Sequence, residues 1–139
     1  MRRGERIAAE ALALVGTPFR LHGRSAETGL DCVGLAALAA ARAGHEGTAP
    51  VHYGLRGGEF ARFATWMADA GLRRVRRARS GDMVLVRAGP AQFHLMVVVP
   101  GGHVHAHAGL RRVVEMPGAS PWPVVGCWRA GRWTRADGE

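Results

Sequence analysis

The sequence predicts one α+β domain, in which helices come first and an antiparallel sheet follows. Two patterns predict this order. Apolar residues recur at helical spacing only before Gly81, whereas the chain after Gly81 consists of short β-branched runs separated by Gly and Pro. A chain of 139 residues with 47% hydrophobic content can bury one substantial core, so a single domain is expected to span 1–139.

Three amphipathic helices are expected in the first half of the chain. The first lies in "MRRGERIAAEALALVG", which resembles a signal peptide for a few residues. Because Glu5 and Glu10 interrupt its apolar run, we interpret it as a helix of the domain and not as a leader. The three apolar stripes are Ile7, Ala11 and Leu14, then Leu35, Leu38 and Ala39, and then Phe60, Phe63 and Met67.

A sheet of four to five strands is expected after the helices. Gly and Pro punctuate this region at every few residues, as they do between antiparallel strands. The tail over 133–139 is expected to fray. The strand-like runs are "DMVLVRA", "QFHLMVVV", "HVHAHAG", "RRVVEM" and "VVGCWRAG".

The charge is strongly basic, with a formal net charge of +8 in which all 19 basic side chains are Arg. Such a surplus favours polyanions, and nucleic acid, a carboxylate-rich cell-wall polymer or an acidic protein surface would each satisfy it. No nucleic-acid-binding motif accompanies the Arg-rich run over 72–82, so we interpret it as a solvated face and predict no nucleic-acid partner. No run approaches the roughly 18 apolar residues that cross a bilayer, so no membrane insertion is predicted.

The two cysteines, 95 positions apart, make neither a disulfide framework nor a zinc knuckle. Asp31 is a good N-cap for the helix that follows it, which would place Cys32 in the first turn. Helix N-termini stabilise a thiolate, so Cys32 is either an activated nucleophile or a small packing residue, and its context favours neither. Cys127 lies in a strand-like run and is predicted to pack in the core.

A nucleophilic thiol needs a base, and the base needs a third group to orient it. Of the seven histidines, His22, His45 and His52 fall in expected loops and are interpreted as surface residues. His94 opens the run "HLMVVV", where it is either a structural residue or that base.

The other three histidines, His103, His105 and His107, alternate along one strand and so share one face. A two-residue turn at 101–102 would pair position 98 with 105 and 96 with 107, which brings His94 to the same face. A Cys/His/His arrangement is then possible. A zinc site is the alternative, but alternate positions on one strand stand about 6.5–7 Å apart, which suits a single ion poorly. We therefore predict no metal and no other cofactor.

Together these segments resemble a known family. The run "VGTPFRLHGRSAETGLDCVGL", followed downstream by "GDMVLV", "FHLMVVV" and "HVHA", is similar to the NlpC-type cell-wall cysteine peptidases, which are papain-like. The resemblance covers about 5–130. Its motifs are Asp-Cys-x-Gly-Leu at 31–35, Gly-Asp at 81–82 and apolar-His-Ala at 104–106. The loop "GRSAETGLDC" and the late run "PWPVVGCWRAG" most resemble short members encoded by phage tails and gene transfer agents.

The resemblance implies a papain-like NlpC-type fold and a role for each motif residue. Cys32 would be the nucleophile, His94 the general base, and His105 the residue that orients His94. Asp31 would help to hold a substrate amine, in competition with its role as a helix cap. On motif grounds His105 is preferred, although the turn at 101–102 would put His107 closer to His94.

Two departures from the family pattern bear on activity. Phe19 stands where many relatives have a Tyr whose hydroxyl faces the active site, and Val33 stands where a Ser is common. The loss of a hydroxyl donor at Phe19 supports the alternative of an inactive structural protein, while Val33 bears on substrate fit.

The function that the resemblance implies is hydrolysis of peptide bonds in peptidoglycan stem peptides. The expected setting is a phage-like tail or gene transfer agent that opens the cell wall during delivery, with a tail hub or baseplate protein as a partner. The protein is expected to be made in the cytoplasm without a signal peptide and to act in the periplasm or cell wall. The alternatives are a structural tail or baseplate protein on the same fold, and acyl transfer by the same three residues.

Overall fold

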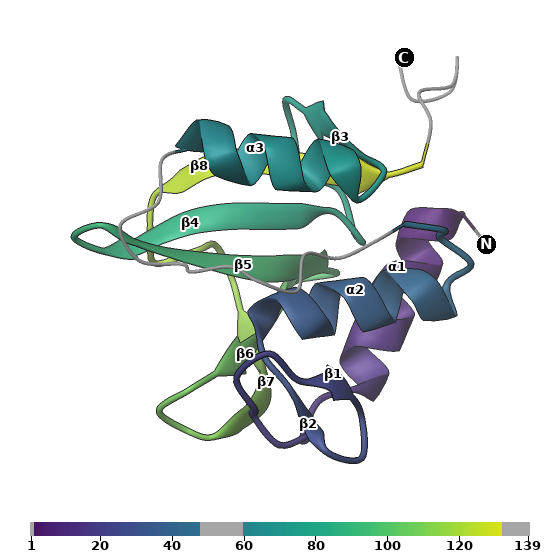
Figure 1. The fold of residues 1–139 in the computed structure, drawn as a ribbon, viewed down its shortest axis with the longest axis vertical. Helices are drawn as coiled ribbons and strands as arrows, with labels where there is room; N and C mark the ends of the chain where they lie inside the picture. The colour runs from purple at the N-terminus through teal and green to yellow at the C-terminus, as the bar shows by residue number, and fades with distance from the viewer. Residues whose placement is uncertain (1, 48–59, 132–139) are drawn as a thin grey trace.

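The computed structural model describes residues 2–47 and 60–131, and the predicted α+β order is confirmed (Figure 1). His52 and the tail over 133–139 lie outside the described residues. The three helices begin and end close to the predicted apolar stripes, because each stripe is buried against the sheet or another helix. They are α1 (Arg3–Ala13), α2 (Cys32–Arg42) and α3 (Phe60–Asp69).

Among the described residues, the main sheet has six antiparallel strands in the order β3-β8-β4-β5-β6-β7. All five predicted strands are present, and a small hairpin of β1 (Arg24–Ser25) and β2 (Gly29–Leu30) stands apart from them. The members of the main sheet are β3 (Leu72–Val75), β4 (Met83–Gly89), β5 (Gln92–Val99), β6 (Gly102–His107), β7 (Arg112–Pro117) and β8 (Val124–Ala130).

The sixth strand, β3, lies inside the Arg-rich run over 72–82, for which the sequence pattern predicts only a solvated face. The prediction of four to five strands is therefore too low. It pairs along β8, with Leu72 opposite Ala130. The guanidinium of Arg74 lies 4.7 Å from the ring centre of Phe60 and 5.9 Å from that of Trp128. Contacts between cations and aromatic rings allow an arginine-rich segment to form an edge strand.

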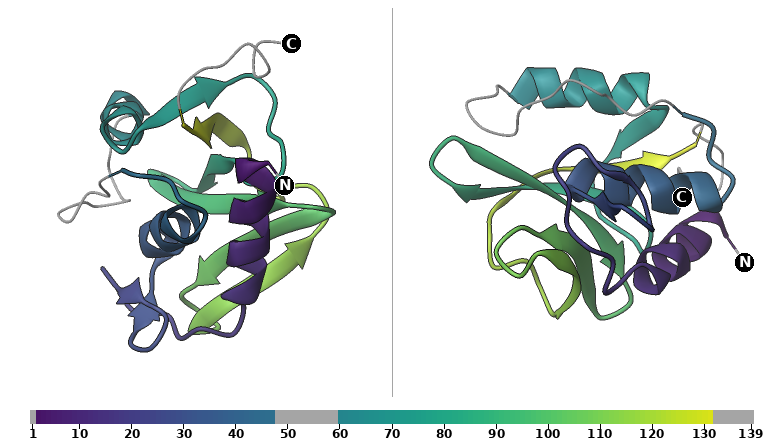
Figure 2. Two further views of the ribbon diagram at one scale, coloured as in Figure 1. Left: turned by 90° about the vertical axis from the view of Figure 1, so that its right-hand side faces the viewer. Right: turned by 60° about the horizontal axis from the view of Figure 1, so that its bottom comes forward.

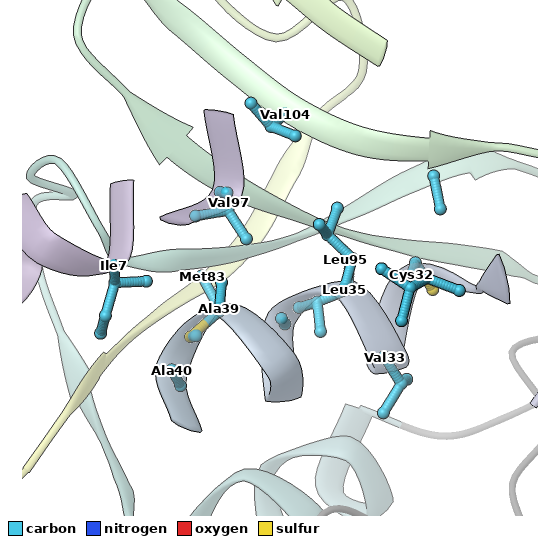
Figure 3. Close-up of a cluster of buried hydrophobic side chains, with 14 of the residues drawn as sticks. Ile7, Cys32, Val33, Leu35, Ala39, Ala40, Met83, Leu95, Val97 and Val104 are labelled. Atoms are coloured by element: carbon cyan, nitrogen blue, oxygen red, sulfur yellow. The ribbon is translucent and has the colours of Figure 1, made fainter. Parts of the chain in front are cut away.

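Helices α1 and α2 lie side by side against β5, while α3 lies beside β3 at the other end of the sheet (Figures 1 and 2). The contact face of α2 is made of small residues such as Ala36, Ala39 and Ala40, so its backbone comes close to the strands. Figure 3 shows this core, in which Leu35 and Cys32 of α2 point toward Leu95 of β5. Cys32 therefore belongs to the apolar core as well as to the first turn of α2.

The hairpin between β5 and β6 differs from the predicted register. Val99 pairs with Gly102 and Val98 with His103, so the turn is made by Pro100 and Gly101, and the predicted pairing of 98 with 105 is wrong. Gly101 has φ +78°, as the third residue of a turn with Pro second requires. Gly102 is instead needed in the strand, because a Cβ there would lie 2.3 Å from the carbonyl oxygen of Met116.

The Gly-Asp pair at 81–82 has a structural role at the start of β4. A Cβ on Gly81 would lie 2.0 Å from the carbonyl oxygen of Gly4, which packs the start of α1 against this turn. The fully buried Asp82 carboxylate accepts two hydrogen bonds of 2.9 Å from Arg129 and one of 2.7 Å from the N–H of Arg79. Charge-assisted, bidentate geometry of this kind fixes β8 against the start of β4.

A second, smaller apolar cluster lies on the other face of the sheet, around Val84, Val86 and Met96. Trp122 and Cys127 pack against it, which confirms the predicted packing role of Cys127. Within residues 2–47 and 60–131, none of the helices has the length and apolarity that a membrane crossing requires.

Candidate active site

Cys32 is the first residue of α2, and Asp31 caps that helix as predicted. The Asp31 backbone is extended, and its Oδ1 accepts a 2.8 Å hydrogen bond from the N–H of Gly34. A Cβ on Gly34 would lie 1.9 Å from the carbonyl oxygen of Gly23, so glycine at this position lets the loop pack against the helix start. The Asp-Cys-x-Gly motif therefore fixes both the cap and the position of the thiol.

The Asp31 carboxylate is buried and engages several donors. Besides Gly34, it accepts a 2.8 Å hydrogen bond from the N–H of His22 and a 3.2 Å bond from Nη1 of Arg24. His22 has φ +61°, in the left-handed region that few residues other than glycine adopt, and in this conformation its N–H reaches Asp31. Asp31 thus ties the loop before α2 to the first turn of the helix.

Cys32, which the sequence leaves open as an activated nucleophile or a packing residue, is only 3% exposed. Burial raises the pKa of Cys32 to about 12, and the Asp31 carboxylate acts in the same direction. The backbone N–H groups of Leu95, Val33 and Cys32 itself lower this pKa, but burial outweighs them. In the resting protein the Cys32 thiol is therefore protonated at neutral pH, although it lies at a helix start.

His94 and His105 are directly bonded to each other. Nε2 of His94 lies 2.9 Å from Nδ1 of His105, and their ring centres are 5.0 Å apart at an angle of 81°. His107 lies beside His105, with 5.6 Å between the two ring centres. The residue bonded to His94 is thus His105, and not the His107 that the turn at 101–102 would have brought closer.

The hydrogen bond to His105 occupies Nε2 of His94, so Nδ1 is the other ring nitrogen of His94. If Nε2 of His94 carries the hydrogen and donates it to His105, then Nδ1 of His94 has a free lone pair and acts as a base. His105, at 3% exposure, is the more deeply buried of the two. The pair has the geometry of a base and its orienting residue.

Both imidazoles are neutral at pH 7. Burial lowers the pKa of His94 to about 4, and the nearby imidazoles of His105 and His107 act in the same direction. Burial also lowers the pKa of His105 to about 4, with smaller effects from His107 and His103. A base must be unprotonated to accept a proton, and His94 meets that condition over the whole physiological range.

One cleft of about 780 Å³ brings the predicted site residues together. A second, apolar cavity of about 70 Å³ between α2 and α3 contains none of them. In the described parts of the chain, no three His, Cys, Asp or Glu side chains are arranged to hold a metal ion. The polar and sulfur-bearing residues along the cleft are His22, Asp31, Cys32, Gln92, His94, His105 and His107, and the aromatic ones are Phe19, Phe93 and Trp122.

The remaining histidines occupy other environments. His22 is exposed at the rim of the cleft, as a loop residue is expected to be. His45 is half-buried, and its Nε2 lies 2.8 Å from the carbonyl oxygen of Ala70, so it is a structural residue and not a surface one. His103 shares the face of His105 on β6 but does not line the cleft.

Trp122 is the residue of this site that the sequence did not reveal. Its ring centre lies 6.0 Å from those of both His94 and His105. It belongs to the connection between β7 and β8, so a whole strand separates it from the histidines of β6. The flanking Pro121 and Pro123 predict an ordered turn, but no pattern in the sequence directs that turn to the histidines.

No family model and no curated protein sequence matches the chain, but solved structures do. NlpC2 from Trichomonas vaginalis matches with a TM-score of 0.67 and 19% identity, over 91% of this chain and 48% of its own. The peptidoglycan hydrolase RipB from Mycobacterium tuberculosis gives 0.65 and 22%, over 94% of this chain and 66% of its own. The P60 domain of an antigen from M. avium subspecies paratuberculosis gives 0.59 and 22%, over 92% and 93%.

The chain therefore has the papain-like α+β fold of NlpC/p60 domains, as the resemblance of its motifs implied. It spans about half of the length of the Trichomonas vaginalis protein that it matches.

Proposed function

We propose that this protein is a cysteine peptidase that hydrolyses peptide bonds in the stem peptides of bacterial peptidoglycan. The observation that carries the proposal is a single cleft lined by Cys32, His94 and His105, in which the two imidazoles share a 2.9 Å hydrogen bond. The fold supports the same function, because proteins of this fold include peptidoglycan hydrolases such as RipB.

The proposed reaction starts from a neutral thiol and a neutral imidazole. As the sulfur of Cys32 attacks the amide carbon, its proton passes to Nδ1 of His94, and His105 accepts the hydrogen bond from the resulting imidazolium. The imidazolium then protonates the departing amine, which leaves a thioester on Cys32. Water, deprotonated by His94, attacks the thioester, and the carboxylate product leaves as the thiol is restored.

The start of α2 supplies the groups that stabilise the negative oxygen of each tetrahedral intermediate. The N–H groups of Cys32 and Val33 open the helix, before the N–H of Gly34 that is already bonded to Asp31. The first N–H groups of a helix have no partner within the helix, which makes them suitable oxyanion donors. Asp31 borders the same cleft, and we propose that it attracts a substrate amine while it caps the helix.

The setting that we propose is a phage-like tail or gene transfer agent, in which the protein acts in the periplasm or cell wall beside a tail hub or baseplate protein. This part of the proposal is supported by the likeness of the loop over 23–32 and of the run over 121–131 to such members. The formal charge of +8 also suits attraction to a carboxylate-rich wall polymer.

The test is digestion of purified diaminopimelate-type peptidoglycan, with the released fragments identified by mass spectrometry. Wild type should release new stem-peptide fragments, and Cys32→Ser should release none. Cys127→Ser is the matched control, since Cys127 packs on the other face of the sheet and should leave the activity unchanged. If folded wild-type protein releases no more than Cys32→Ser, the peptidase is rejected in favour of a structural protein on the same fold.

A further inference from the structure

Trp122 stands in direct contact with both imidazoles of the proposed site. Its ring plane makes an angle of 81° with that of His94 and also with that of His105, and both centres lie 6.0 Å away. Edge-to-face arrangements at this distance are the favoured geometry of aromatic pairs. One indole therefore contacts the two partners of the 2.9 Å hydrogen bond at the same time.

The connection that carries Trp122 is fixed at several points. The Ser120 hydroxyl donates a 2.7 Å hydrogen bond to the carbonyl oxygen of Trp122 and accepts one of 3.1 Å from its N–H. Pro121 and Pro123 restrict the backbone on either side. The carbonyl oxygen of Pro123 accepts a 3.0 Å bond from the N–H of Arg87 in β4, the neighbouring strand of His94. The backbone that carries the indole is thus fixed on both sides of Trp122.

Trp122 also lies on the outer face of the sheet, beside the histidines. Its indole packs against the cluster of Val84, Val86 and Met96, and it borders the cleft on the side of His94. On this side the indole is therefore a neighbour of the hydrogen bond between the two imidazoles.

We propose that Trp122 is a positioning residue, which keeps water from the hydrogen bond between His94 and His105 and holds the His94 ring in the orientation of a base. This inference rests on the proposed function for its effect on catalysis, but its effect on the two imidazoles can be measured without any substrate.

The charged and titratable groups around the imidazole pair come from elements other than the connection that carries Trp122. His103 and His107 come from β6, Cys32 and Asp31 from the start of α2, and Arg112 of β7 is opposite His107. An indole face attracts an imidazolium, which favours protonation, whereas its bulk removes water, which disfavours protonation. Burial is the largest cause of the lowered pKa of both imidazoles, so removal of the indole should raise them.

The experiment compares Trp122→Ala and Trp122→Phe with wild type. The pKa values of His94 and His105 are measured by NMR titration of the imidazole Cε1–H signals, which are assigned with His94→Gln and His105→Gln. Trp122→Ala should raise at least one of the two by one pH unit or more, while Trp122→Phe retains an aromatic cover and should restore most of the wild-type value. Trp66→Leu is the matched control, because Trp66 is a half-buried indole that packs on Phe63 away from the cleft.

The kinetic readout separates positioning from binding. With peptidoglycan fragments as substrate, Trp122→Ala should lower kcat at least tenfold with KM changed less than twofold, and should move the acidic limb of the pH profile to higher pH. Unchanged imidazole pKa values in folded Trp122→Ala would overturn the inference. If Trp122→Ala does not fold, a Trp122→Leu variant with unchanged pKa values would overturn it equally.

Failure of the proposed function gives a different result. If wild type has no activity on peptidoglycan but the NMR shift appears in Trp122→Ala, then Trp122 positions the imidazoles and only the peptidase is rejected. If wild type is active and the variant titrates and turns over like wild type, the peptidase stands and the role of Trp122 is rejected.

Discussion

Acidification should destabilise this protein through the imidazole pair, and the size of the effect follows from the site. The bond between Nε2 of His94 and Nδ1 of His105 needs one donor and one acceptor, so it is lost when both rings are protonated. The pKa of each ring falls from 6.5 in the unfolded chain to about 4 in the folded protein. Between these values the unfolded state binds more protons, so the folded state loses stability as the pH falls from 6.5 to 4.

The linkage between proton binding and folding lowers the free energy of unfolding at pH 4.5, relative to pH 7.5, by on the order of 2–3 kcal/mol for one such imidazole. The second imidazole adds to this, although the two titrate as a pair and the sum is not exact. A loss of this size is a large part of the roughly 5–15 kcal/mol that stabilises a typical domain.

The assay is urea unfolding of wild type and of His94→Gln at pH 7.5 and 4.5, followed by circular dichroism. Between pH 7.5 and 4.5 the free energy of unfolding should fall by about 2–3 kcal/mol more in wild type than in His94→Gln. The carboxylates titrate in both proteins, so their contribution cancels in the comparison. His45→Gln, which removes an imidazole far from the cleft, should behave like wild type. Equal losses in wild type and His94→Gln would refute the assignment of a buried, neutral imidazole pair.

Two further predictions concern the buried ionisable groups. Asp82→Asn should lower the free energy of unfolding by about 3–5 kcal/mol, because it leaves the Arg129 guanidinium without its bidentate partner, and adding Arg129→Met should recover part of that loss. A loss below about 1 kcal/mol in urea unfolding would show that the pair adds little. Burial raises the pKa of the Cys32 thiol from 9.0 to about 12, so between these values the folded state binds more protons than the unfolded state. The free energy of unfolding should therefore be unaffected by this thiol below pH 9 and should fall between pH 9 and 12, at about 1.4 kcal/mol per pH unit. Cys32→Ser should show a flatter decline over this range, and folded wild type should react with iodoacetamide more slowly at pH 8 than the urea-unfolded protein; faster labelling of the folded form would contradict a protonated Cys32.

The parts of this fold that follow from local sequence patterns could be predicted, and the parts set by distant contacts could not. The helical stripes, the five strands after Gly81 and the cap at Asp31 each depend on a few neighbouring residues. Strand β3 escaped notice because aromatic rings from α3 and β8 cover the arginine of an edge strand. The predicted register of β5 and β6 differs from the observed one, because Gly102 lies in the strand, where it packs closely against Met116, and not in the turn.

The site shows the same division. The alternation of residues along the strands predicts that His94 and His105 share one face. The apolar-His-Ala motif favours His105 over His107 as the partner of His94, and the 2.9 Å hydrogen bond between His94 and His105 agrees with that preference. The ionisation of Cys32 depends instead on how completely α2 and β5 exclude water, which no local pattern specifies. Trp122 arrives from the β7–β8 connection, and only the folded chain brings it to the histidines.

Burial of Cys32 and His94 determines when the thiol proton can leave the sulfur in the proposed peptidase. Burial raises the pKa of Cys32 and lowers that of His94. Transfer of the thiol proton to the imidazole is therefore unfavourable in the resting protein. An ion pair formed before substrate arrives would place two opposite charges on buried groups, where solvation of each is poor. The proton transfer therefore has to accompany attack on the amide carbon, when the negative charge moves from sulfur to an oxygen that the N–H groups of α2 can stabilise. A resting neutral pair also leaves the thiol inert until a carbonyl group lies against the start of α2, which makes reactivity depend on the fit of the substrate in the cleft.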